Sequence, residues 1–328
     1  MPIKREQAVI SVDLGGSKIL SAVIGAQGTI IARDLRPTEA RRGVEVVFRN
    51  VLDSVSAAVI KAELSLKPAA LGICVPSIAN SNAGIVYHPS NLPGWENVPL
   101  GNMLQKATGL KTFVMNDANA AALGELYFGA AIGIRNCVYV TISTGIGGGI
   151  IIDGKLYEGH TGLAGEVGHM VVEPHGIPCG CGSSGCWERY ASGSAIALKA
   201  KTAVNAGKKT NLLKLAGGNV EKIDANLIHA AALQGDKLAK ELIAESARYL
   251  AIGFGNLINI FNPQMIIVGG GYARMGKVLL QPAFKLAARY SFPEAFAANR
   301  FRLAKLGGNS GIRGTAAYVF NELADTRN

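Results

Sequence analysis

Long apolar runs are absent from this sequence of 328 residues. The longest ones are interrupted by Gly, Asn or a charged residue before about 18 residues, the length that a membrane-spanning helix needs. The first residues, MPIKRE, also lack the apolar stretch of a signal peptide. We therefore expect a soluble cytoplasmic protein that has no membrane partner.

Charged residues are scarce, at 17% of the chain, and long basic runs are missing although the formal net charge is +10. Lys and Arg are scattered, with doublets such as Arg41-Arg42 and Lys208-Lys209. Scattered basic residues are typical of a solvated surface, whereas nucleic-acid-binding proteins gather them on one face or tail. We expect no nucleic-acid partner, and the basic balance slightly favours an anionic ligand such as a nucleotide.

The two common nucleotide-binding motifs are also absent. The sequence contains no G-x-x-x-x-G-K-[ST], and the run GIGGGI at 145–150 lacks the last glycine of G-x-G-x-x-G and leads into a strand-like segment. A P-loop and a Rossmann-type dinucleotide site are therefore excluded.

Glycine is abundant instead, with 41 residues, and hydrophobic residues make up 49% of the chain. This composition is typical of a compact α/β enzyme. A chain of 328 residues exceeds the size at which one hydrophobic core keeps growing, so we expect two domains.

A strand-turn-strand pattern occurs twice. Residues 8–13 (AVISVD) read as a strand, which turns through Gly15-Gly16 and returns over residues 19–24. The same plan recurs with a strand at 137–143, a turn at 144–147 and a strand at 149–152. The repeat predicts two domains of similar topology. We assign residues 1–115, completed by a C-terminal helix at 314–328, to the first domain, and residues 116–313 to the second.

Strands and helices alternate through the rest of the chain, which indicates an α/β fold with mixed sheets. Helical spacing or composition predicts helices at 45–64, 118–131, 238–261 and 314–323, and apolar runs predict strands at 70–75, 111–115 and 265–268.

Three glycine-rich turns each follow an apolar strand. Glycine lets backbone N–H groups approach a polyphosphate closely, and Asp13 beside the first turn could hold a hydrated Mg²⁺. A single turn of this kind is more simply a hairpin, but three of them favour phosphate binding. The candidate ATP and Mg²⁺ residues are Asp13, Gly15, Gly16, Ser17, Lys18, Thr144, Gly145, Gly147 and Gly270.

Three of the five cysteines, Cys179, Cys181 and Cys186, fall within eight residues. In a cytoplasmic chain they are not expected to form disulfides, and their spacing suits one tetrahedral ion. The sequence therefore predicts a structural zinc site with His169 as the fourth ligand. His175 and His160 are alternative ligands, and a redox pair with a buried thiol is the alternative to a metal. Cys74 and Cys137 lie in apolar, strand-like segments and are expected in the core.

These features together resemble the ROK family (repressors, open reading frames and sugar kinases) over nearly the whole chain. The matching segments are DLGGSKI at 13–19, NLPGW at 91–95, MNDANAAALGE at 115–125, TGIGGG at 144–149, E-x-G-H at 166–169 and CGCGSSGCWE at 179–188.

The resemblance implies a two-domain, actin-like (ribonuclease H-like) ATPase fold with ATP across the interdomain cleft. It implies a kinase with ATP, Mg²⁺ and a hexose as partners, in which Asp117 is the general base, and a homodimer as the assembly. Sugar contacts are implied for Asn91, Asn116, Asp117, Glu166, His169 and Glu188. Glucose is the first expectation, because NLPGW and CGCGSSGCWERYASG look like segments of bacterial glucokinases.

Alternatives remain at this stage. Asp117 alone could be a helix N-cap, because Asn116-Asp117 precedes a helix. The sugar could be N-acetylglucosamine or N-acetylmannosamine, with fructose or allose as further choices. The chain could also be a sugar-responsive repressor, although only twelve residues precede Asp13, too few for a helix-turn-helix domain.

Four positions depart from the family pattern. Cys74 and Ser77 stand where the family usually has glycine, Asn80 where it has aspartate, and Ser90 where it often has proline. The first three lie in a segment that resembles a sugar-bordering loop, which leaves the preferred sugar open.

Overall fold

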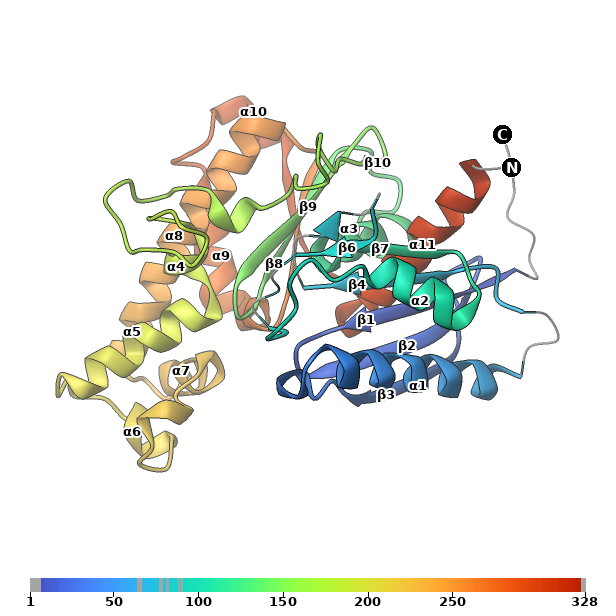
Figure 1. Ribbon diagram of the computed structural model, residues 1–328. Helices are drawn as coiled ribbons and strands as arrows, with labels where there is room; N and C mark the ends of the chain where they lie inside the picture. The colour runs from blue at the N-terminus through green and yellow to red at the C-terminus, as the bar shows by residue number, and fades with distance from the viewer. Residues whose placement is uncertain are drawn as a thin grey trace. The chain divides into compact units, whose positions relative to one another are not determined.

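The structure is a computed structural model that describes residues 7–63, 67–76, 79–80, 83–87, 89 and 91–325. The chain forms two compact units (Figure 1). Unit 1 consists of Met1–Arg135, Gly149–Gly165 and Lys305–Asn328, and unit 2 consists of Asn136–Gly148 and Glu166–Ala304. The chain thus leaves unit 1 twice and returns to it twice.

Unit 1 is built on a five-stranded mixed sheet with the order β3-β2-β1-β4-β7. β2 is antiparallel to β1 and β3, whereas β4 is parallel to β1 and β7. The strands are β1 (Ala8–Leu14), β2 (Lys18–Gly25), β3 (Ile30–Pro37), β4 (Leu71–Val75) and β7 (Thr112–Asn116), and β5 (Ala79–Asn80) pairs separately with β6 (Ile85–Val86).

Helices cover both faces of this sheet (Figure 1). On one face Val12 packs with Val51 of α1, and on the other Val9 packs with Val319 of α11. Because both faces are buried, β1 and β4 read as nearly continuous apolar runs rather than as alternating ones. The helices of unit 1 are α1 (Val44–Ala62), α2 (Leu100–Thr108), α3 (Asp117–Phe128) and α11 (Ser310–Asp325).

A second five-stranded sheet has the order β10-β9-β8-β11-β12. β11 is parallel to β8 and β12, and β9 is antiparallel to β10. Strand for strand this repeats the plan of the first sheet, so the internal repeat expected from the sequence is present in the topology. Its strands are β8 (Cys137–Ile142), β9 (Ile146–Ile152), β10 (Lys155–Leu156), β11 (Met265–Gly269) and β12 (Arg300–Leu303).

The core of unit 2 gathers around α8, whose ends are both marked in the sequence. Asp236 caps its start by accepting a hydrogen bond from Ala239 N, and Asn262 takes a left-handed conformation after its last turn, before Pro263. Phe254 of α8 is fully buried among aromatic rings. The helices of unit 2 are α4 (Glu188–Ala191), α5 (Gly193–Asn205), α6 (Leu212–Leu215), α7 (Ala225–Leu233), α8 (Lys237–Phe261), α9 (Gly276–Ala287) and α10 (Pro293–Ala298).

The predicted division of the chain at residues 115 and 116 falls inside unit 1. The chain runs from β7 directly into α3, and α3 packs along α11. Residues 116–135 therefore belong with the first sheet. Residues 149–165 are also part of unit 1, and α11 begins at Ser310, four residues before the predicted start of the last helix.

Of the four positions that depart from the family pattern, Cys74 is fully buried in β4. Asn80 ends β5, and Ser77 and Ser90 lie outside the described residues. Within the described part of the chain, the helices lack the combination of length and apolar character that crossing a membrane requires.

A buried carboxylate, Glu125 near the end of α3, joins α3 to the segment that leads into α11. The side chain is fully buried. Its Oε2 accepts hydrogen bonds from Ala130 N at 2.8 Å and Lys305 N at 3.0 Å, and its Oε1 accepts from Leu306 N at 2.9 Å and Ser310 Oγ at 3.2 Å. Four donors thus compensate for the removal of this charge from water.

Glu125→Gln should destabilise unit 1, because the new amide NH₂ faces two N–H or O–H donors in place of an acceptor. Each orphaned donor costs about 1–3 kcal/mol. Urea denaturation followed by circular dichroism measures the loss. Glu45→Gln, the same change at an exposed residue of α1, should stay within about 0.5 kcal/mol of the unaltered protein. Equal midpoints for the two variants would contradict this account of Glu125.

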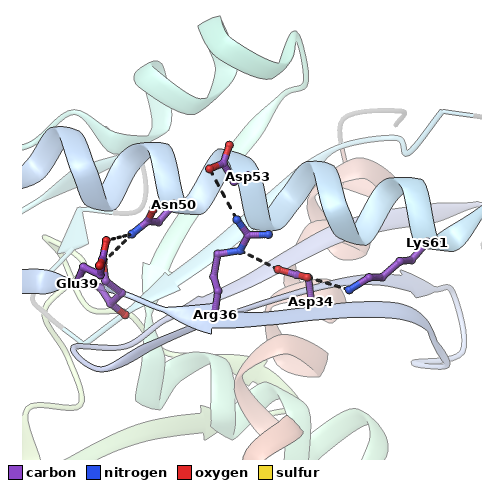
Figure 2. Close-up of polar contacts among 7 residues, drawn as sticks. Asp34, Arg36, Glu39, Asn50, Asp53 and Lys61 are labelled. Atoms are coloured by element: carbon purple, nitrogen blue, oxygen red, sulfur yellow. Dashed lines mark hydrogen bonds and ion pairs between the residues drawn. The ribbon is translucent and has the colours of Figure 1, made fainter.

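Ion pairs connect the edge strand β3 to α1 (Figure 2). Asp34 lies between Lys61 Nζ, 2.9 Å from its Oδ1, and Arg36 Nε, 2.8 Å from its Oδ2. Arg36 also reaches Asp53 of α1 at 3.7 Å. Burial alone would raise the pKa of Asp34, but the hydrogen bonds from Lys61 and Arg36 outweigh it and hold the pKa below its usual value.

Asp34→Asn should lower stability near neutral pH and have a smaller effect in acid. A pKa that is lowered in the folded state adds stability above the unfolded value of about 4, and this stability is lost as the pH falls through the folded value. Urea midpoints near neutral pH and at about pH 3 measure the difference. Asp53→Asn is the control, since Asp53 is 58% exposed and should matter little at either pH. If Asp34→Asn lost the same amount of stability at both pH values, the stabilisation could not come from the ionised carboxylate of Asp34.

Candidate functional site

The predicted site residues of unit 1 lie at the carboxyl ends of its parallel strands. Asp13, near the end of β1, is the register partner of Cys74 in β4. Asn116 ends β7 opposite Val75, and Asp117 begins α3. Because the carboxyl ends of parallel strands share one edge of a sheet, Asp13, Asn116 and Asp117 are gathered at that edge.

The turn after β1 is held by Thr38, a residue that the sequence analysis missed. Gly15 N donates to Lys18 O at 3.0 Å, which closes the turn. Thr38 is fully buried; its hydroxyl donates to Gly15 O at 2.6 Å and its N–H to Ser17 O at 3.1 Å. The side chains of Ser17 and Lys18 are exposed. Burial raises the pKa of Asp13 beside the turn, and the charge of Lys18 opposes this rise.

Gly16 brings this turn against Asn91 of the NLPGW segment. A β-carbon at residue 16 would lie 2.8 Å from Asn91 Cβ and 3.0 Å from Asn91 O, so a larger residue would push the two segments apart. Two of the predicted residues, one assigned to phosphate and one to sugar, are therefore in contact within unit 1.

Asn116 and Asp117 have different structural roles at the start of α3. Asn116 Oδ1 accepts hydrogen bonds from Ala118 N at 2.8 Å and Asn119 N at 3.1 Å, which makes Asn116 the N-cap. The alternative that Asp117 is the cap is wrong. Asp117 is the first helical residue, where the N-terminal end of the helix favours a negative charge.

The two glycine turns of unit 2 follow neighbouring parallel strands. Residues 143–145 follow β8, and residues 270–271 follow β11, which pairs with β8. The turn is shorter than predicted, because β9 begins at Ile146 and so contains Gly147. Gly270 has a φ of 91°, and its backbone lies against Ile142 O.

The start of α5 holds the turn after β8. Gly193 N donates to Ser143 O at 2.8 Å, and Ser194 Oγ donates to Thr144 O at 2.5 Å. Ser194 is a second residue that the sequence analysis missed. Its partner lies fifty residues earlier in the chain, so no local pattern marks it.

Gly145 brings the same turn against Glu188, the first residue of α4. A β-carbon at residue 145 would lie 2.7 Å from Glu188 Oε2. This contact matches the one between Gly16 and Asn91 in unit 1. In each unit, a glycine turn thus lies against a side chain that the family resemblance assigns to the sugar.

In the described part of the chain, one group of side chains has the composition and closeness of a metal site. It consists of His169, Cys179, Cys181 and Cys186, whose ligand atoms all lie within 4.8 Å of one another. The alternative ligands His160 and His175 are not members of the group.

Two of the distances within this group match the edges of a zinc site. Cys179 Sγ lies 3.7 Å from His169 Nδ1, and Cys181 Sγ lies 3.6 Å from Cys186 Sγ. A tetrahedral zinc ion with ordinary Zn–S and Zn–N bonds has ligand-to-ligand edges of about 3.5–3.8 Å. Burial and the neighbouring thiols raise the pKa of Cys186.

Two carboxylates stand next to this group. Glu166 Oε2 lies 3.9 Å from His169 Nε2, the ring nitrogen that faces away from Cys179, and Glu188 Oε1 lies 3.6 Å from Cys179 Sγ. Burial raises the pKa of Glu166, and the nearby His169 opposes the rise. A carboxylate on the second nitrogen of a metal-binding imidazole fixes the orientation of the ring.

Comparison with protein families matches residues 9–322 of the chain to the ROK family. The chain belongs to the ROK family. Among curated relatives, this ROK protein is 37% identical to a glucokinase of Streptomyces coelicolor, covering 94% of this chain and 96% of the relative. It is 36% identical to a glucokinase of Thermotoga maritima, covering 95% and 96%.

A solved structure is similar over the same extent. The ROK family glucokinase of Streptomyces griseus in complex with glucose and AMPPNP superposes with a TM-score of 0.80 at 37% identity, covering 95% of this chain and 98% of that one. The predicted fold class, a two-domain α/β protein of the actin-like type with mixed sheets, is confirmed.

Proposed function

We propose that this ROK protein is an ATP-dependent sugar kinase that phosphorylates the primary hydroxyl of a hexose, with glucose as the first choice. The repeated contact between a glycine turn and a candidate sugar ligand carries the proposal: Gly16 lies against Asn91, and Gly145 lies against Glu188. A kinase must hold phosphate and acceptor hydroxyl side by side, because positioning supplies most of its catalysis. The similarity to a glucokinase solved with glucose and AMPPNP supports the same conclusion.

The sugar would be held by groups that donate to hydroxyls or accept from them. Carboxylates accept from sugar O–H groups, amides serve either way, and the imidazole of His169, with one ring nitrogen on zinc, would donate from the other. Since Asn116 Oδ1 caps α3, we assign its amide N–H₂ to the sugar. The proposed sugar ligands are Asn91, Asn116, Asp117, Glu166, His169 and Glu188.

Asp117 is the proposed general base. Its carboxylate would accept the proton of the primary hydroxyl while the sugar oxygen forms a bond to the γ-phosphorus. The bond from that phosphorus to the β–γ bridging oxygen breaks, and ADP leaves. The proton stays on Asp117 until it is released to solvent.

The glycine turns are the proposed binding sites for the ATP phosphates. Backbone N–H groups at Gly16, Gly145 and Gly270 would donate to phosphate oxygens, supplemented by Ser17, Lys18, Thr144 and Gly147. Gly15 would act through its conformation, since its N–H closes the turn on Lys18 O. Asp13 would hold Mg²⁺, which neutralises phosphate charge when it is bound with the nucleotide.

The proposed zinc site has a structural role and consists of His169, Cys179, Cys181 and Cys186. Four protein ligands leave no open position for a reacting water. Zinc bound there would fix the loop that carries Glu188, which lies two residues after Cys186.

We also propose that the protein forms a homodimer, on the family resemblance alone. Light scattering after size-exclusion chromatography tests this proposal.

Asp117→Asn should lower kcat by about 10²–10⁴-fold and leave the KM for sugar nearly unchanged, because the amide keeps the size of the side chain but cannot take the proton. ADP release measures turnover. Asp153→Asn, at an exposed residue after β9, is the matched control and should be fully active. Near-normal turnover in Asp117→Asn would show that another group takes the proton.

The same assay identifies the acceptor. Glucose, fructose, allose, N-acetylglucosamine and N-acetylmannosamine should be compared at equal ATP concentration, and glucose should give the highest kcat/KM. A higher value for an N-acetylhexosamine would change the substrate but leave the kinase assignment intact. No turnover on any sugar would overturn the function itself.

The purified protein should contain about one zinc ion per chain, as a closed four-ligand site requires. Metal analysis by mass spectrometry should show its loss in Cys181→Ala. Cys137→Ala is the control: Cys137 lies in β8, burial raises its pKa to about 12, and the metal content should not change. Full metal content in Cys181→Ala would rule out Cys181 as a ligand.

A further inference from the structure

The three cysteines of the proposed zinc site lie on a folded loop, residues 176–187, which we call the ligand loop. Its two arms are paired: Gly185 N donates to Ile177 O at 2.9 Å, and Cys179 N donates to Ser183 O at 2.8 Å. One arm leads to Cys179, and the other contains Cys186. The ligand atoms converge only while these arms stay together.

Tyr190, just after the ligand loop in α4, is hydrogen-bonded to the first arm. Its phenol oxygen accepts from Ile177 N at 2.7 Å, two residues before Cys179. Gly176 makes room for the contact, because a β-carbon at that residue would collide with the Tyr190 hydroxyl. The phenol thus connects the start of the loop to the helix that follows its end.

The ring of Tyr190 is itself held firmly. It is 6% exposed and packs on Tyr249 of α8, with ring centroids 4.5 Å apart. Lys199 Nζ lies 5.3 Å from the Tyr190 ring and forms a 2.8 Å ion pair with Glu245 of α8. Trp187, the last residue of the loop, donates its indole N–H to Tyr249 O at 2.8 Å. The hydroxyl of Tyr190 therefore sits at a point fixed by α8.

We propose that Tyr190 is a positioning residue for the metal. Its hydroxyl holds the arm at Ile177 in the metal-binding conformation before zinc arrives, so that binding does not have to order the loop. The inference rests on the proposed zinc site and assigns no ligand atom to Tyr190. A site that is ordered in advance binds more tightly, because less conformational freedom is lost on binding.

Tyr190→Phe tests this, because it removes only the oxygen and keeps the ring. The full-length protein is stripped of metal, and its Kd for Zn²⁺ is measured by competition with a chromophoric chelator. Contacts outside the ligand set typically change metal affinity by about 10–100-fold, and we expect at least about a tenfold weakening. Tyr249→Phe, the same change on the neighbouring ring, should bind Zn²⁺ as the unaltered protein does.

The unfolding midpoint of each metal-free variant in urea separates positioning from general stability. A lower midpoint for Tyr190→Phe with an unchanged Kd would overturn the proposal, as would equal weakening in Tyr249→Phe. Gly176→Ala is the second variant. Its β-carbon would meet the Tyr190 hydroxyl and also the backbone at Glu173 O and Gly185 Cα, so it should weaken Zn²⁺ binding at least as much as Tyr190→Phe does.

The unaltered protein is titrated first. If it takes up no Zn²⁺, the proposed zinc site is wrong. If it binds Zn²⁺ and Tyr190→Phe binds Zn²⁺ equally well, the zinc site stands and only the role of the Tyr190 hydroxyl is wrong. Sugar KM, measured at saturating Zn²⁺, should be the same in Tyr190→Phe and the unaltered protein, because bound zinc then holds the ligand loop in the same conformation in both.

Discussion

The four hydrogen bonds to the buried carboxylate of Glu125 connect parts of unit 1 that are about 180 residues apart in the chain. They join the end of α3 to the segment that enters α11. α3 begins at Asp117, and the first turn of α11 lies beside Asp13: a β-carbon at Gly311 would be 3.1 Å from Asp13 Oδ2. Of the two carboxylates proposed for catalysis, Asp117 thus begins one of these helices, and Asp13 at the end of β1 lies against the other. An apolar residue at position 125 could fill the space but could not satisfy the three backbone N–H groups that point into it.

Unit 2 places its functional groups in a different way, from a hydrophobic helix outward. Trp187 and Tyr190 anchor the ligand loop on α8, and the same short segment carries Glu188 to the turn at Gly145. The proposed metal site and the proposed sugar and phosphate groups therefore share one support. The proposed sugar ligands directly adjoin the proposed metal ligands. Glu166 faces the imidazole of His169, and Glu188 lies 3.6 Å from Cys179 Sγ.

The features that could be predicted from the sequence are those with a local signal. The strand-turn-strand repeat, the apolar pattern of α8 and the spacing of Cys179, Cys181 and Cys186 all depend on residues that are near one another in the chain. Thr38, Ser194 and Glu125 could not be found in this way. Glu125 meets Lys305 across 180 residues, and a buried glutamate inside a helical pattern looks like any other polar position until its partners are known. The domain boundary predicted at residue 115 also lacked a local signal, because only the packing of α3 along α11 assigns residues 116–135 to unit 1.

The discontinuous make-up of unit 1 has a consequence for its synthesis. Its sheet is covered on one face by α11, where Ser11 Oγ donates to Ile312 O across 301 residues. A ribosome releases β1 long before it releases α11, so during translation the apolar face around Val9 has no native cover. Unit 2, in contrast, lies entirely between residues 136 and 304 and has its own core. On the ribosome, the later part of this chain can finish folding before the earlier part, the reverse of the usual order.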